Sequence, residues 1–598
     1  MKTTLIKLVT PFALTALVAT TVFAADPLAD SWLTTYSGQY ARIYTTDANK
    51  AGGNAVATWS NGSQTQSAPA YSGVQEIYSS TNWLYVRSTG LGAHVMGPWY
   101  LNVAHSQAFP NYPVNTKALW RFPRTNTIPA TKTQTGLGTI GLFVDGVAMF
   151  DSSDGFYWNG TGESGGGGTG YWHREAYANE GVTFDPGYAH QEQTGTHHYH
   201  ANPIALRYLL GDHVDYNATT KTYSESTNAV TKHSPILAWV RDGLPVYGPY
   251  GYSNALDSAS GVRRMISGFQ LRNGSNGTDN NTTRATIPAW AQRLYNVAAA
   301  QAGPAVSTTY PIARYMEDYA YLGDLINAAT GSNYQQGVEF DLNEYNVRWC
   351  VTPEFPGGTY AYFVSIETNG TPKYPNNIGR AFFASPTGSS QTSIAETVTT
   401  NFLGGPNLRE SLNPPAVVDN NNIVLVWSAI EGGTYRVEAL SNAVATSWTV
   451  LVTNASSAAA TGTFTETNAL NDDTRFYRVA RTALATYDPV SGTTGGGGNG
   501  ILSVSPTSGN RGTTFTLTIN LDPAVNPPPA NAPINSVTVG TITGTGNVHV
   551  SLTQVTSSIT IPAGAVIGAK TVTVVFPGPP GNPTATVTYT LTNGFTIN

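Results

Sequence analysis

Residues 194–201 read Thr-Gly-Thr-His-His-Tyr-His-Ala, a run that a glycine and a following proline delimit as a short extended segment. Side chains alternate along a strand, so His198 and His200 are expected on one face and His197 on the other. Imidazoles two residues apart on a strand stand about 7 Å apart at their Cα atoms and can lean onto one ion. The segment predicts a β-rich fold with a metal-binding pair at His198 and His200.

Further candidate ligands surround this pair. Seven of the ten histidines fall between residues 173 and 233. His190, His173 and His233 are candidate additional ligands, and Glu344 is the carboxylate that we expect as a ligand or general base. Copper and zinc are the divalent ions that imidazole sites favour, and the sequence does not separate them. Two alternatives stay open, which are a proton-transfer site without metal and histidines that are purely structural.

The N-terminus predicts export. Lys2 and Lys7 precede the apolar stretch Leu8–Phe23, which ends in small residues suited to cleavage after Ala24 or Ala25. This pattern is typical of a signal peptide. No later run of 18 apolar residues follows, so we expect no transmembrane segment in the mature chain. The expected location is secreted, at the cell surface or in the periplasm.

Composition excludes some function classes. Charged residues make up 11% of the 598 residues, against about 25% in an average soluble protein. The net charge is −6 and no Lys/Arg cluster occurs, so nucleic acid is an unsuitable partner. The single cysteine, Cys350, allows no internal disulfide and is expected to be a buried, inert thiol.

The chain is expected to be mainly β and divided into several parts. The predicted parts are a signal peptide (1–24), a β-dominated α+β domain with long loops (26–388), a linker (389–422), a β module (423–487), a Gly-rich linker (488–500) and a second β module (501–598). The best helix candidate is 287–302, and the sequence does not decide whether the first 60 or so residues of the large domain form a separate unit. Asp242-Gly243 is a hairpin turn signal, with a second role for Asp242 in orienting a histidine left open.

The two C-terminal modules resemble immunoglobulin-like β-sandwiches. Residues 423–481 alternate in short strands about ten residues apart and resemble fibronectin type III-like modules, which implies Trp427 and Tyr435 as core residues. The opening Val504–Gly512 is similar to the start of IPT/TIG domains. Such modules imply a spacer or adhesion role.

Longer motifs resemble the YHYH domain family. The matching strings are His190-Gln-Glu-Gln-Thr-Gly-Thr-His-His-Tyr-His-Ala-Asn-Pro203, His233-Ser-Pro-Ile-Leu-Ala-Trp-Val-Arg-Asp-Gly-Leu-Pro-Val-Tyr-Gly-Pro-Tyr-Gly251, Gly141–Phe150 and Asp341–Asn346 leading into Pro356–Tyr362. The resemblance spreads over roughly 90–385. It implies an exported protein with histidines and acidic residues near one strand, and no settled enzymatic role.

The chain departs from the family pattern at two positions. His197 stands where the signature has its first tyrosine, on the face that we expect to lie opposite the ligand pair. Ala361 stands where the family tends to carry a histidine, which implies one ligand fewer if that histidine binds an ion elsewhere in the family.

Three functions are compatible with these features. The leading hypothesis is a non-catalytic, exported metal-binding domain on β-sandwich spacers, with a metal ion as partner and a cell-surface or extracellular polymer as a further candidate partner. The second is a metal-dependent extracellular hydrolase or oxidoreductase, which needs an open coordination position and an acid or base. The third is an adhesion or matrix protein with structural histidines.

Overall fold

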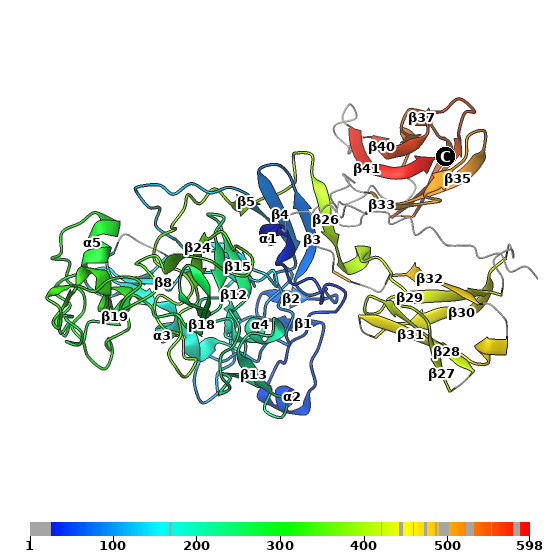
Figure 1. Cartoon of the computed structure of the whole chain (residues 1–598). Helices are drawn as coiled ribbons and strands as arrows, with labels where there is room; N and C mark the ends of the chain where they lie inside the picture. The colour runs from blue at the N-terminus through cyan, green and yellow to red at the C-terminus, as the bar shows by residue number, and fades with distance from the viewer. Residues whose placement is uncertain are drawn as a thin grey trace, which may run out of the picture.

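The computed structural model describes residues 26–166, 170–419, 421–441, 447–458, 460–471, 475–484, 487–488, 501–521, 532–551, 553–577 and 586–598. Strands contain 41% of the residues and helices 8%, which confirms the expectation of a mainly β chain. The predicted signal peptide and residues 489–500 of the predicted Gly-rich linker lie outside the described residues. Figure 1 shows one large N-terminal part and two smaller β modules beside it.

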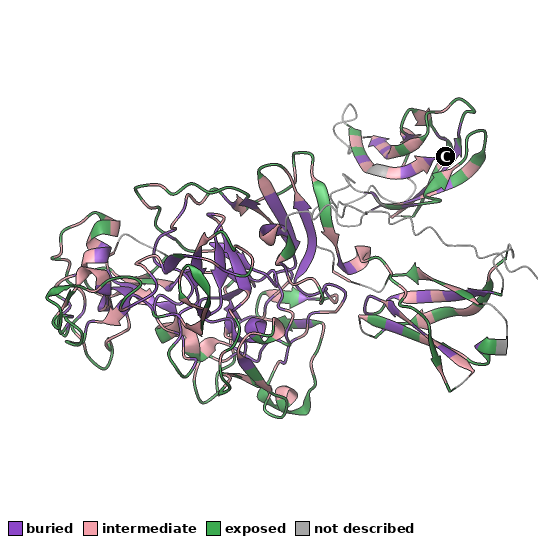
Figure 2. Ribbon diagram, in the orientation of Figure 1, coloured by how far each residue is buried: buried purple, intermediate pink, exposed green. Residues whose placement is uncertain are grey.

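An eight-stranded mixed sheet lies at the centre of the large part, in the order β11-β12-β7-β6-β15-β16-β24-β23. Its strands are β6 (Gly141–Phe143), β7 (Ala148–Met149), β11 (Ala189–Gln191), β12 (His197–Tyr199), β15 (Ile236–Val240), β16 (Pro245–Tyr247), β23 (Val347–Cys350) and β24 (Thr359–Phe363). Every residue of the apolar strand β15 is buried, as expected for a central strand covered on both faces. Figure 2 shows buried residues concentrated in this sheet.

The predicted turn at Asp242-Gly243 joins β15 to β16. Gly243 adopts a φ of 81°, a left-handed conformation that glycine takes without steric cost. Asp242 accepts a hydrogen bond from the backbone N–H of Leu244 at 3.1 Å, which closes the turn. Its second oxygen accepts from the hydroxyl of Tyr362 at 2.6 Å and from a backbone N–H of residue 384 at 3.0 Å.

A five-stranded sheet, in the order β25-β5-β4-β3-β26, packs on the same core. Its strands are β3 (Val74–Ser79), β4 (Trp83–Ser88), β5 (Ala118–Pro123), β25 (Ser389–Ser390) and β26 (Thr399–Leu403). Leu28 and Val74 belong to one hydrophobic cluster with Trp239 of β15, so the first residues of the large part share its core. Residues 389–403, expected as linker, instead supply two edge strands, because open ladders at β3 and β5 can accept them.

Small sheets of two or three short strands surround the two larger sheets. They are formed by β1 (Trp59–Asn61) with β2 (Gln64–Gln66), β8 (Ser153–Trp158) with β9 (Glu163–Gly165) and β10 (His173–Glu175), β13 (Val214–Asn217) with β14 (Thr222–Glu225), β17 (Tyr250–Asn254) with β18 (Asp257–Arg264), β19 (Phe269–Leu271) with β20 (Tyr319–Tyr321), and β21 (Ile326–Asn327) with β22 (Ser332–Asn333). The connections between these short strands are the long loops that the Gly, Asn and Pro content predicts.

The helices of the large part are short. They are α1 (Pro27–Asp30), α2 (Asp47–Gly52), α3 (Ala176–Glu180), α4 (Ile204–Leu209) and α5 (Ala289–Tyr295), with 3-10 turns η1 (Gly181–Thr183), η2 (Met316–Asp318), η3 (Leu322–Asp324) and η4 (Gly405–Asn407). The helix expected over 287–302 covers only α5. Asn296 ends it in a left-handed conformation, and the carbonyl of Ala299 accepts a hydrogen bond from the N–H of Ile287, so tertiary contacts override helix propensity there.

Each C-terminal module has two sheets around one core. The first has β27 (Ala416–Val418), β28 (Asn422–Ser428) and β31 (Thr461–Glu466) facing β29 (Thr434–Leu440), β30 (Thr449–Ser456) and β32 (Phe476–Ala483), with the turn η5 (Ala469–Asn471). The second has β33 (Ile501–Ser505), β35 (Thr514–Leu521), β38 (Thr545–Ser551) and β39 (Gln554–Thr560) facing β34 (Ser508–Gly509), β36 (Ser536–Val539), β37 (Ile542–Thr543), β40 (Gly568–Pro577) and β41 (Thr586–Ile597). Trp427 and Tyr435 are buried in the first core, as expected.

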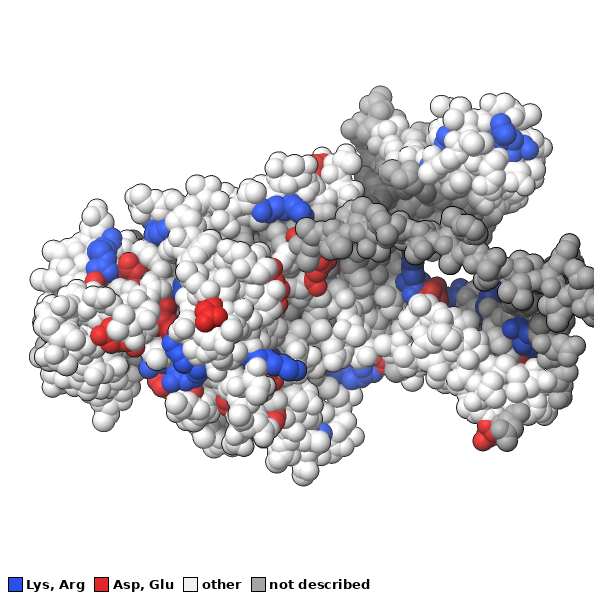
Figure 3. Space-filling view, in the orientation of Figure 1, with Lys and Arg blue, Asp and Glu red and all other residues white. Residues whose placement is uncertain are grey.

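Three further features agree with the composition. Cys350 is buried, and burial raises the pKa of its thiol to about 11, so the thiol stays protonated and inert. Charged side chains are scattered over the described surface in Figure 3, without a continuous basic patch on that face. Among the described residues, the helices are all too short or too polar to cross a membrane.

Candidate metal centre

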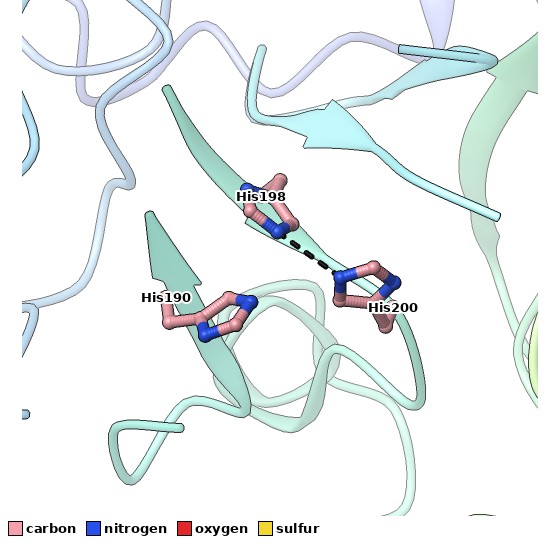
Figure 4. A group of neighbouring side chains, drawn as sticks. All are labelled: His190, His198 and His200. Atoms are coloured by element: carbon pink, nitrogen blue, oxygen red, sulfur yellow. Dashed lines mark hydrogen bonds between the residues drawn. The ribbon is translucent and has the colours of Figure 1, made fainter. Parts of the chain in front are cut away.

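The register of β11 and β12 brings three histidines to one face of the sheet. His190 lies directly opposite His198 in the antiparallel pair, and His200 follows two residues later on the same side. Directly opposed residues on paired strands have Cβ atoms about 5 Å apart, close enough for their rings to meet. One ring nitrogen from each histidine lies within 4.8 Å of the other two. Figure 4 shows the three imidazoles directed toward one another.

Hydrogen bonds at Nδ1 fix the tautomers of His198 and His200. His198 Nδ1 lies 2.9 Å from the carbonyl of Thr196, and His200 Nδ1 lies 2.7 Å from the carbonyl of Asp151. A carbonyl can only accept, so both Nδ1 atoms carry the proton. Each neutral ring therefore presents a lone pair at Nε2, and these two atoms are 3.1 Å apart. Two facing lone pairs need a cation or an added proton between them.

His190 has the same tautomer for a different reason. Its Nδ1 lies 2.7 Å from the hydroxyl of Thr183, and that hydroxyl donates its own proton to the carbonyl of Glu180 at 2.7 Å. The hydroxyl oxygen must therefore accept from His190 Nδ1–H. The third Nε2 lone pair is thus also directed at the cluster, and Nδ1 bonds of this kind orient metal-binding histidines in many proteins.

A carboxylate lies beside two of the three imidazoles. Glu180, the last residue of α3, places Oε2 3.2 Å from His200 Nε2 and 3.7 Å from His190 Nε2. This oxygen is buried and has no partner of hydrogen-bond geometry. Four ligands about 2.1 Å from a tetrahedral ion stand roughly 3.4 Å from one another. Three separations in this group, 3.1 Å between His198 and His200, 3.2 Å between His200 and Glu180 and 3.7 Å between His190 and Glu180, are close to that spacing.

The protonation of the cluster is consistent with ligand binding. Burial lowers the pKa of His190 to about 4, and burial also holds the pKa of His198 well below its usual value, so both rings are neutral at pH 7. For His200, burial is outweighed by the adjacent Glu180 carboxylate, which raises the pKa of the imidazole. Glu180 shows the converse, because burial is outweighed by His200 and its pKa is lowered. One proton on this pair occupies the position that a divalent ion would take.

Aromatic rings hold the imidazoles in place. Phe150 stacks on His198 at a centroid distance of 3.8 Å and meets His200 edge-on at 5.8 Å. Phe184 meets His190 edge-on at 4.8 Å. The three histidines are 2 to 5% exposed, so the centre is largely closed to solvent.

The structure does not bring the other three predicted ligands to this cluster. His173 lies on β10, where its Nδ1 is 3.0 Å from Glu317. His233 donates from Nδ1 to a neighbouring backbone carbonyl at 2.7 Å and packs edge-on against Tyr247. Glu344 forms an ion pair with Arg293 at 2.6 Å. These residues were candidates because they lie near conspicuous motifs in the sequence. In the structure each of them contacts other groups instead.

The remaining expectations concern His197, Asp242 and Ala361. His197 lies on the opposite face of β12, next to Trp99, as strand alternation predicts. The contacts that Asp242 makes are those of a turn and of Tyr362, not of a histidine. Ala361 lies on β24, five strands from β12, which is roughly 24 Å at about 4.8 Å per strand. A histidine at 361 could therefore not reach this centre.

Sequence reasoning missed Glu180 and Thr183. Glu180 lies ten residues before His190, and no spacing rule connects the end of a short helix to a strand that follows a loop. The only available signal was an acidic residue close upstream of the histidine strand. Both residues come from the continuous α3–η1 turn, so one local structure supplies a carboxylate and orients an imidazole.

Comparison with known proteins identifies part of the chain. No curated protein and no solved structure matches it. The model of the family described as "YHYH protein" matches residues 119–375, which include the whole eight-stranded sheet and the histidine cluster. The chain therefore contains a YHYH domain, within narrower bounds than the 90–385 expected from its motifs.

Proposed function

We propose that the YHYH domain binds one divalent transition-metal ion through His190, His198, His200 and Glu180. The observation that carries this proposal is that three Nε2 lone pairs point toward one another. Hydrogen bonds at Nδ1 set the tautomer of each of these imidazole rings. Three imidazoles and one carboxylate suit zinc or copper, which prefer nitrogen-rich sites. The carboxylate neutralises part of the charge that the ion brings into a buried position.

The burial of the centre favours metal holding over catalysis. A catalytic ion keeps a coordination position open to substrate, whereas the imidazole rings here are enclosed by Phe150 and Phe184. The donor set already contains four groups. The proposed role is therefore stable metal binding. The ion would either stabilise the folded domain or be sequestered by it.

We further propose that this domain acts outside the cytoplasm. The N-terminal signal-peptide pattern supports export. With a single cysteine the chain can form no internal disulfide, so a bound metal would supply a stabilising cross-link. The two C-terminal sandwiches are proposed as fibronectin type III-like and IPT/TIG-like spacers. They would present the domain at the cell surface or to an extracellular polymer.

Metal content of purified protein tests the central proposal. The full mature chain is stripped with a chelator, reloaded with zinc or copper, and analysed by elemental mass spectrometry. Variants His198→Ala and His200→Ala should each lose one equivalent of metal. The matched control is His105→Ala, because His105 is an exposed histidine that pairs with Asp47 and belongs to no metal-type group of the described residues.

Thermal unfolding separates metal binding from structural packing. Removal of a structural ion should lower the Tm of the wild-type domain, because metal binding to the folded state adds to folding free energy. If chelation leaves the Tm unchanged and the His198→Ala chain binds as much metal as wild type, the histidines are packing residues and the proposal fails.

A further inference from the structure

Another group of metal-type ligands lies on the other face of β12. His94, Asp185 and His197 each offer one donor atom, and these atoms lie within 4.8 Å of one another. All three residues are buried, His197 with no exposed surface. The alternation that turns His198 and His200 one way turns His197 toward this second group.

The imidazole of His197 has no hydrogen-bond partner. Both of its ring nitrogens are buried without a contact of hydrogen-bond geometry, although the backbone of His190 lies nearby. A neutral imidazole carries one lone pair, and here no donor faces it. A buried polar atom left unpaired costs about 1–3 kcal/mol, and a ligated ion would remove this cost.

Asp185 is the buried carboxylate of this group. Its oxygens accept backbone N–H groups from residues 97, 187 and 189, at 2.7, 2.8 and 3.2 Å. Within the described part of the chain, its one ion-pair partner is His94, 3.4 Å away. That separation is long for a hydrogen bond and matches the roughly 3.4 Å between neighbouring ligands of a tetrahedral ion.

The ring of His94 is fixed by two glycines. A Cβ atom at Gly187 would lie 2.6 Å from His94 Nε2, and one at Gly92 would lie 3.0 Å from its Nδ1. Any other residue at either position would push the ring away. His94 Nδ1 is also buried and unpaired, so the ring is held firmly without all of its polar atoms being satisfied. Unsatisfied buried polar atoms are rare in native proteins, and a bound ion is one explanation for them.

We propose that His94, Asp185 and His197 form a second, separate divalent-metal site. It would take a zinc- or copper-like ion, as a two-imidazole, one-carboxylate set does. Two of its ligands fall outside the family pattern that the sequence resembles. His94 lies outside the span that matches the family, and His197 replaces the tyrosine of the signature. The ion would join the segment around residue 94 to the loop before β11 and to β12.

Metal stoichiometry with site-selective variants tests this second site. The full mature chain is stripped, reloaded with zinc and analysed by elemental mass spectrometry. Wild type should bind two ions, and each of His197→Tyr and His197→Gln should bind one. His197→Tyr restores the residue of the family signature, so it is the variant best matched to the fold. A chain with His198→Asn and His200→Asn should also bind one ion, and the combination with His197→Tyr should bind none.

The outcomes separate the two sites. Wild-type stoichiometry retained in both His197 variants overturns the second site, whatever the His198/His200 chain does. If the His197 variants lose an ion and the His198/His200 chain loses none, the second site is supported and the proposed function at the first cluster is refuted. X-ray absorption of zinc bound to the His198/His200 chain needs no change at the second site, so it decides the question even if the His197 variants fail to fold. It should report two imidazoles, and a chain that holds no zinc contradicts the proposal.

Discussion

Thr183 orients His190 through a single hydrogen bond, although Thr183 would not itself touch the metal. Its hydroxyl accepts from His190 Nδ1 at 2.7 Å while donating to a backbone carbonyl. Thr183→Val keeps the shape and removes the acceptor. Loss of such an orienting partner typically costs about 10–100-fold in metal affinity. We therefore expect Thr183→Val to raise the zinc Kd by about that factor in competition with a chromogenic chelator.

The control for this change is Thr220→Val, in the exposed turn between β13 and β14. It alters the same atoms away from the cluster, so its Kd should equal that of wild type. An unchanged Kd in Thr183→Val would show that the ring of His190 is held by Phe184 alone and not by the hydroxyl.

Asp242 makes the stability of the domain depend on pH. Burial raises its pKa from 3.8 to about 6, despite hydrogen bonds from Tyr362 and from backbone N–H groups. The folded state therefore binds a proton more tightly than the unfolded state. The stabilising contribution is fully present below pH 3.8 and is lost as pH rises through about 6. Between pH 4 and pH 7 it amounts to roughly 2 kcal/mol.

Comparison with Asp242→Asn isolates this contribution. The amide does not titrate, so wild type should gain roughly 2 kcal/mol over the variant when the pH falls from 7 to 4. Urea denaturation followed by tryptophan fluorescence measures it, because ten of the twelve tryptophans lie in residues 26–388. A difference between the two chains that is the same at both pH values would refute the assignment.

At the scale of elements, local sequence patterns predicted the histidine strand better than its partners. Alternation in residues 197–200 follows from strand geometry alone, and the structure has His198 and His200 on one face. The pairing of β11 with β12 could not be predicted from the sequence, because the register depends on which strands meet in the fold. The contributions of Glu180 and His94 depend on tertiary folding. The sequence therefore predicted part of the candidate centre, but not which distant residues the fold brings to it.

At Gly141 the backbone of the neighbouring strand leaves no space for a side chain. Gly141 begins β6, where an added Cβ would lie 2.5 Å from the carbonyl oxygen of Trp239 and 3.0 Å from the Cα of Val240. These are backbone atoms of the central strand β15 and cannot rotate away. Gly141→Ala should therefore destabilise the domain by about 1–3 kcal/mol through overpacking. Gly162→Ala is the matched control, because nothing lies within 4 Å of its added Cβ.

Thermal melting of the two alanine variants measures the effect. A Tm lowered by several degrees in Gly141→Ala, with Gly162→Ala within about 0.5 kcal/mol of wild type, is the expected result. Equal melting temperatures would mean that β6 can move away from β15, and the central sheet would then be less rigid than its buried strands suggest.

At the scale of the whole molecule, the first C-terminal module is docked on the large part. Glu431 of the module accepts a hydrogen bond from the backbone N–H of Tyr40 at 2.8 Å and pairs with Arg42. Its own N–H donates to the carbonyl of Gly38 at 2.8 Å. Asp488, directly after the module, accepts from Gln66 at 2.8 Å. A spacer resemblance in the sequence gave no sign of this contact, because the contact depends on residues almost 400 positions apart.

Glu431→Ala should release the module from the large part. The change leaves the N–H of Tyr40 and the guanidinium of Arg42 without their acceptor, and we expect a coupling loss of about 1–3 kcal/mol because the arginine is partly exposed. Small-angle X-ray scattering should show a larger radius of gyration, and calorimetry should show the module melting separately. Glu466→Ala is the control, since Glu466 pairs with Arg475 inside the module. It should lower the Tm of the module without expanding the molecule. If Glu431→Ala leaves the scattering profile unchanged, Asp488 and the surrounding contacts hold the module, and Glu431 does not control the docking.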